Sequence, residues 1–270
     1  MTATGRGVIL PPPVRATLIV LLASAGVAAQ ARAQAPGAAA RPGSPAWTAD
    51  SVIARYVVAR GGEAKIHAVR TERMIGHITL ASGRSGSDTV ELARPLRIRT
   101  TIHLGHVLIV QGYDGATAWT INPFAGDTAP RPLDPGTAKN VIAGADMDGP
   151  LVNHAAKGER VSLAGVDTAA GRPAWALTVT SRDGTTDTWF VDTASYMITK
   201  WQGRRVINGT PLTFDTWFRA YRRVDGLMFP FRMESDTRGR PGSQRIAFDT
   251  IQVDPPIADA RFRLPPPATP

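Results

Sequence analysis

The sequence predicts an α+β domain in which about ten to eleven antiparallel strands follow one N-terminal helix. Three observations lead to this fold class. One stretch with helical periodicity stands near the start, alternating apolar and polar residues fill most of the remainder, and turn dipeptides separate the alternating runs. Turn signals that recur every ten to fifteen residues or so are typical of an antiparallel meander. A helical insertion near residues 134–156 interrupts the predicted strands.

The first 33 residues have the features of a signal peptide. Arg6 and Arg15 flank the start of an apolar run of 14 residues, and the triplet Ala31–Ala33 fits a small-x-small cleavage site. This run is short for a bilayer span, although a retained anchor helix is the alternative. We expect export to the periplasm and cleavage near Ala33. Loss of the three arginines in this segment would lower the net charge from +9 to +6.

The composition divides the rest of the chain into a linker, one domain and a tail. Residues 34–47 are rich in Pro, Gly and Ala without apolar periodicity, which indicates a flexible linker. Residues 48–264 carry the periodic patterns and form the predicted domain, and residues 265–270 form a proline-rich tail. The chain contains no cysteine, so disulfides, thiolate metal sites and a cysteine nucleophile are excluded.

The predicted domain begins with a helix. Thr48 can cap it, an apolar face follows, and Gly61-Gly62 ends it; the face consists of Val52, Ile53, Tyr56 and Val57. Residues 63–69 suggest a short second helix. After Val69 the period changes to two, and the stretches 73–80 and 96–104 each alternate apolar with polar residues. Such alternation predicts strands with one buried face.

The stretch from Gly112 to Gly126 combines aromatic, Asp and Gly residues, so it is either a hairpin or an active-site loop. Asp114-Gly115 is a strong hairpin turn signal, and Asn122-Pro123 ends a strand. We therefore predict a hairpin that carries a buried Trp119. Residues 137–147 and 151–156 predict helices, and further strands are expected at 160–167, 172–181, 186–193, 196–209, 212–226, 227–236 and 244–254.

Catalytic and metal-binding patterns are weak in this sequence. His103 and His106 would point to opposite faces of a strand, so one ion could not bind both. Asp146 and Asp148 begin like a calcium loop, but Leu151 and Lys157 stand where that loop requires Gly and Glu. No phosphate loop or dinucleotide fingerprint occurs. We expect no catalytic residue, no metal site and no cofactor, and hence no enzyme.

The aromatic residues are more informative. Ten of them lie in or beside predicted strands, and two helices are a thin cover for so many strands: Trp119, Phe124, Trp175, Trp189, Phe190, Trp201, Phe214, Trp217, Phe218 and Phe229. A strongly curved sheet with a loosely filled concave side would leave an apolar cavity. Core packing is the alternative for each of them. Our candidates for the lining of such a cavity are Met74, Ile78, Ile98, Ile102, Trp119, Ile121, Trp189 and Trp217.

Four phrases together resemble the LolA-like outer-membrane lipoprotein-sorting proteins, in an uncharacterised branch of that family. They are residues 52–78, YDGATAWTINPFAG, ADMDGPLVNHAAKG and VDGLMFPFRMES, and the resemblance extends over residues 48–264. It implies an unclosed, strongly curved antiparallel β half-barrel with helices over its concave face. It also implies a role in holding acyl chains in an apolar cavity. No specific residue of the family can be placed here by motif.

Two functions follow as expectations. The first is a periplasmic, non-catalytic carrier or binding protein for lipoproteins or other acyl-chain lipids, with transient membrane contact. The second is a sensory or adaptor domain that binds another envelope protein, as an anti-sigma-factor regulator with this fold does. We expect a monomer and no nucleic-acid partner, because export separates the protein from nucleic acid and no long Lys/Arg block occurs.

Overall fold

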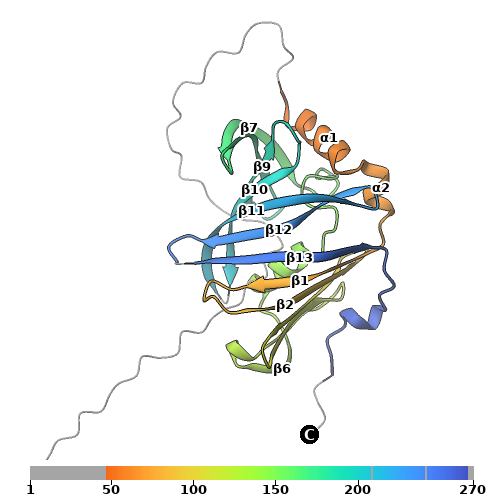
Figure 1. Cartoon of the computed structure of the whole chain (residues 1–270), viewed down its shortest axis with the longest axis vertical. Helices are drawn as coiled ribbons and strands as arrows, with labels where there is room; N and C mark the ends of the chain where they lie inside the picture. Colours follow the sequence, from red (N-terminus) through yellow and green to blue (C-terminus); the bar gives the residue numbers. More distant parts are fainter. Residues whose placement is uncertain (1–46, 208, 241, 267–270) are drawn as a thin grey trace, which may run out of the picture.

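A computed structural model describes residues 47–207, 209–240 and 242–266. The predicted signal peptide, nearly all of the predicted linker and the last four residues of the tail lie outside this part of the chain. Its main feature is one 13-stranded antiparallel sheet with the order β6-β5-β4-β3-β2-β1-β13-β12-β11-β10-β9-β8-β7. The strands β7 and β6 at the two ends of this order lie far apart, near the top and the bottom of Figure 1. The sheet is therefore unclosed.

The elements follow one another along the chain with short connections. The helices are α1 (Ala49–Arg60), α2 (Glu63–Ala68) and α3 (Pro135–Gly144), and the 3-10 helices are η1 (Pro123–Ala125) and η2 (Asp259–Phe262). The strands are β1 (Thr71–Thr79), β2 (Ser85–Ala93), β3 (Arg97–Leu104), β4 (Val107–Tyr113), β5 (Ala118–Asn122), β6 (Asp127–Pro132), β7 (Arg160–Ala169), β8 (Arg172–Thr180), β9 (Thr186–Asp192), β10 (Ile198–Ile207), β11 (Thr210–Val224), β12 (Leu227–Thr237) and β13 (Ser243–Val253).

The first helix forms as the sequence predicts. Thr48 accepts a hydrogen bond from the backbone N–H of Ser51, and the Ser51 side chain completes a capping box. Val52, Ile53 and Tyr56 are buried on one face. Gly61, with φ at 135°, ends the helix in a conformation that suits glycine. These local signals fix the start, the buried face and the end of α1.

The curvature of the sheet follows from the contacts of α3. This ten-residue helix touches β3, β4 and β5 as well as β10, although the strand order separates these two groups. A helix of this length is about 15 Å long, so the sheet must bend around it. In Figure 1, α1 and α2 lie together along one side of the molecule. The sheet is thus a curved, open antiparallel structure with its helices on the concave side, which confirms the predicted α+β class and the LolA-like fold.

Two strands and one helix differ from the expectations. Sequence alternation gave about eleven strands and missed β2 and β6. β2 begins with Ser, Gly and Asp, which are poor strand formers, and β6 contains two prolines, which an edge strand tolerates. Residues 151–156 form turns and not the predicted helix. Asn153 adopts a positive φ of 53°, which a continuous α-helix does not allow.

The stretch from Gly112 to Gly126 is a hairpin, as predicted, followed by η1 and its exit turn. β4 and β5 pair in register, and the Asp114 carboxylate accepts the backbone N–H groups of Ala116 and Thr117. This turn chemistry is sufficient to explain the presence of Asp114. The stretch is therefore a structural hairpin that sets β5 beside β4.

Candidate functional site

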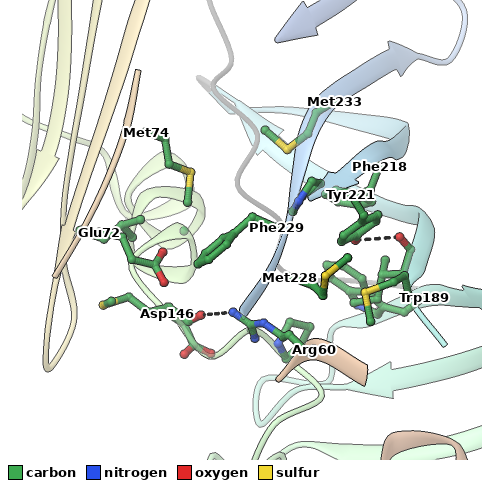
Figure 2. A pocket seen from close by; sticks show the side chains of 18 of the residues that line it. Arg60, Glu72, Met74, Asp146, Trp189, Phe218, Tyr221, Met228, Phe229 and Met233 are labelled. Atoms are coloured by element: carbon green, nitrogen blue, oxygen red, sulfur yellow. Dashed lines mark hydrogen bonds between the residues drawn. The ribbon is translucent and has the colours of Figure 1, made fainter. Parts of the chain in front are cut away.

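A cavity of about 180 Å³ lies between the concave face of the sheet and the helices. Strands from both halves of the sheet, α1, the end of α3 and the loop after α3 contribute to its wall (Figure 2). The lining residues are Tyr56, Arg60, Glu72, Met74, Leu92, Ala143, Gly144, Asp146, Met147, Gly149, Pro150, Trp189, Met197, Ile198, Phe218, Tyr221, Met228, Phe229, Pro230, Met233 and Phe248.

Most of this wall is apolar and rich in methionine and aromatic side chains. Trp189 contacts Phe218 in a stacked arrangement with ring centroids 6.2 Å apart, and it also packs at 6.2 Å from Trp201, which is buried behind it. Figure 2 shows Met74, Phe229 and other pocket side chains around a common space. Methionine is unbranched and flexible, so a wall of this kind can adapt to chains of different shape.

The cover of the pocket consists of α1, α2, α3 and the loop 145–158, which we call the lid. Polar contacts hold its parts together. The guanidinium of Arg60 donates to the backbone oxygens of Met147, at 2.8 Å, and Asp148. Lys157 donates to the Asp146 carboxylate at 2.5 Å. The lid loop is therefore attached to α1 and closed upon itself by charged donors.

Arg94, in the turn after β2, joins the lid to the sheet. It donates to the two carboxylate oxygens of Asp148 at 2.5 and 3.1 Å, and to the backbone oxygens of Ile66 and Val69. Burial alone would raise the pKa of Asp148, but the hydrogen bonds and charge of Arg94 lower it below the ordinary value. Asp148 thus remains ionised over a wide pH range, and the attachment persists with it.

Glu72 is the buried acid of the pocket. Its side chain comes from β1, and the residue is 4% exposed. Burial raises the pKa of Glu72 to about 7, although the charges of Arg60 and Arg94 act in the opposite direction. Burial would lower the pKa of Arg60, but Tyr56 and Glu72 raise it, so this guanidinium stays charged. The pocket therefore has a polar end within an otherwise apolar wall.

The structure distributes the eight candidate residues over both faces of the sheet. Met74 and Trp189 line the pocket. Ile78, Ile98 and Ile102 are buried in the main apolar core but do not border the cavity. A role in ligand binding stays a prediction for each of these residues.

Trp119 and Ile121 lie on the opposite face of the sheet from the pocket. Trp119 pairs with Gly112, which in turn pairs with Arg99, whereas Ile102 on the concave face pairs with Ile109. The indole N–H of Trp119 donates to the backbone oxygen of Phe262 at 2.9 Å. The C-terminal segment thus buries Trp119 from outside, so its burial does not indicate a cavity, and this placement corrects the expectation for both residues.

Trp217 also lies outside the pocket. It pairs with Lys200, whose ammonium is 5.3 Å from the ring centroid, while the neighbouring pair Trp201 and Thr216 faces inward. The pocket receives Phe218 and Tyr221 from the same strand instead. These two residues are three positions apart, and they share a face because Ala220 between them has a positive φ of 53° and breaks the alternation.

Sequence reasoning did not single out Arg60 or Glu72. Arg60 looks like an ordinary basic residue in the last turn of α1, and Glu72 like a polar position at the start of a strand. The signal that was available for Glu72 is alternation, because it stands two residues before Met74 and therefore on the same face. The ADMDG stretch at 145–149, which fails as a calcium loop, forms the lid contacts.

The part of the chain that the structure describes contains no cluster of three or more His, Cys, Asp or Glu side chains arranged to hold a metal ion. No helix within the described residues is long and apolar enough to cross a membrane.

Comparison with known proteins supports the fold. No protein-family model and no curated protein matches the sequence. A LolA superfamily protein from Nitrosomonas europaea is 14% identical with a TM-score of 0.55, over 81% of this chain and 98% of that one. An outer membrane lipoprotein-sorting protein domain from Vibrio parahaemolyticus is 11% identical with a TM-score of 0.54, over 79% and 97%.

A third solved structure, a DUF1329 family protein from Desulfovibrio piger, is 11% identical with a TM-score of 0.55 and covers 80% of this chain and 97% of that one. The three structures agree over nearly their whole lengths. At these identities the similarity shows a shared fold.

Proposed function

We propose that this protein is a non-catalytic carrier or binding protein for acyl-chain lipids or lipoproteins. The observation that supports the proposal most directly is the cavity under the lid, whose wall consists mainly of Met, Phe and Trp side chains. An apolar chain in such a cavity gains about 0.8 kcal/mol for each CH₂ group removed from water. The features of the first 33 residues place this role in the periplasm.

The volume of the cavity sets the mechanism. At about 180 Å³, it is close to the size of an engineered cavity of roughly 150 Å³ that binds benzene, and it is smaller than the ~300–1,000 Å³ of typical ligand pockets. The closed form therefore accommodates only part of a long acyl chain. Loading requires the lid to move, and its attachments are polar contacts that water can replace.

Lipid uptake tests the proposal. Gently purified protein should carry acyl chains in native mass spectrometry, and stripped protein should take up a fluorescent fatty-chain probe. Met228→Glu would place a charge in the pocket wall and should reduce uptake at least tenfold or so. Leu108→Glu is the matched control, because Leu108 is 38% exposed and lies outside the pocket. Protein without bound lipid and without uptake would contradict the proposal, as would equal loss in both variants.

A further inference from the structure

Two ionisable side chains line the pocket without a charged hydrogen-bonding partner of opposite sign. Asp146 is bonded to Lys157 and Asp148 to Arg94, each at 2.5 Å, whereas Arg60 bonds only to backbone oxygens. Among the described residues, the Glu72 carboxylate makes no hydrogen bond or ion pair, although the residue is 4% exposed. Glu72 is thus a buried acceptor that borders the cavity.

The surroundings of Glu72 explain why it is the acceptor that a ligand can use. The charged groups that act on it are Arg60 from α1, Arg94 after β2, Asp148 from the lid loop and Asp254 after β13. Both cations already donate to lid oxygens. A buried carboxylate without a hydrogen-bond donor is unfavourable, so a donor brought by a ligand would be stabilised here.

The position of Glu72 relative to the apolar wall fits one molecule with two parts. Glu72 and Met74 are two residues apart on β1 and point to the same face, as Figure 2 shows. Phe229 lies near both in the same view. A head group at Glu72 would therefore continue directly into a hydrocarbon chain against Met74 and the aromatic side chains.

We propose that Glu72 binds the head group of the ligand, and that this head group presents an N–H donor, as an ammonium or amide does, next to the hydrocarbon chain. The inference rests on the proposed carrier function and specifies its ligand. Anionic amphiphiles bind less well, because their head would meet the Glu72 carboxylate. The selectivity opposes nonspecific attraction, since the chain carries a net charge of +9.

Two probes with equal chains test this inference on the full chain. Dodecylammonium and dodecyl sulfonate, below their micelle concentrations at pH 8.5, are titrated by displacement of a fluorescent fatty-chain probe. The wild-type protein should bind the ammonium roughly ten- to hundredfold more tightly. Glu72→Gln should remove this preference. Glu234→Gln, a carboxylate on β12 that pairs with Arg245 outside the pocket, should keep it.

The outcomes separate this inference from the carrier function. Equal binding of both probes, or tighter binding of the sulfonate, would overturn the role of Glu72 while lipid binding stands. An unchanged preference in Glu72→Gln would do the same. Failure of both probes to bind would overturn the carrier function as well. The comparison of probes on the wild-type protein needs no variant, so it decides even if Glu72→Gln does not fold.

Discussion

Asp88 gives the sharpest prediction for stability. It lies on β2 with no exposed surface, opposite Gly76 and Ile102, and neither carboxylate oxygen has a hydrogen-bond partner among the described residues. Burial raises the pKa of Asp88 from 3.8 to about 7. Between about pH 4 and 7 the folded protein therefore binds more protons here than the unfolded chain does, and stability falls as the pH rises through this window.

The magnitude follows from the two pKa values. A carboxyl group with a pKa of 3.8 when unfolded and about 7 when folded destabilises the ionised native state by on the order of 4 kcal/mol above pH 7. Asp88→Asn keeps the shape and stays neutral, so it resembles the protonated acid. The variant should exceed the wild-type free energy of unfolding by about 4 kcal/mol at pH 8 and by about 1 kcal/mol at pH 4.5.

Urea unfolding at a series of pH values measures this difference. Asp167→Asn, which changes an exposed carboxylate on β7, is the control and should leave the pH dependence unchanged. The reasoning is refuted if the curves for Asp88→Asn and the wild type run parallel between pH 4.5 and 8. A parallel offset would mean that the site contributes through packing and not through its charge.

Three further changes test other contacts. Asp148→Asn removes the charge that Arg94 binds, so hydrogen exchange of the lid loop should rise by roughly ten- to hundredfold while the sheet stays protected. Phe262→Ala should lower the free energy of unfolding by about 3–5 kcal/mol in urea titrations, because its side chain is fully buried on the outer face. Gly112→Ala would place a methyl group against the Trp119 ring and should lower stability by about 1–3 kcal/mol, with a shift in tryptophan fluorescence.

The features that the sequence predicts correctly depend on neighbouring residues. The cap at Thr48, the Gly61-Gly62 end of α1 and the Asp114 turn are each determined within a few positions. The alternation of the strands likewise indicates that a curved antiparallel sheet has one apolar face. These local signals are why the fold class and the order of most elements could be predicted.

The pocket could not be predicted to the same degree, because alternation identifies two faces without saying what covers each. Trp119 is buried by the C-terminal segment, which is distant in the sequence. Trp217 lies one position from the pocket residue Phe218, and the positive φ at Ala220 then brings Tyr221 to the pocket side. A one-residue uncertainty in register exchanges the two faces, so only coordinates assign these aromatic residues.

The two coverings of the sheet differ in chemistry, and this difference bears on how the lid could open. On the outer face, Phe262 is fully buried, and Arg261 pairs with Glu91 at 2.7 Å. On the concave face, the lid loop is held by hydrogen bonds from Arg60 and Arg94. Removing a buried Phe side chain costs about 3–5 kcal/mol, whereas a hydrogen bond to a charged group contributes about 1.5–3 kcal/mol and water replaces part of it. The lid loop can therefore detach at lower free energy than the outer cover, so the pocket can open while the sheet keeps its support.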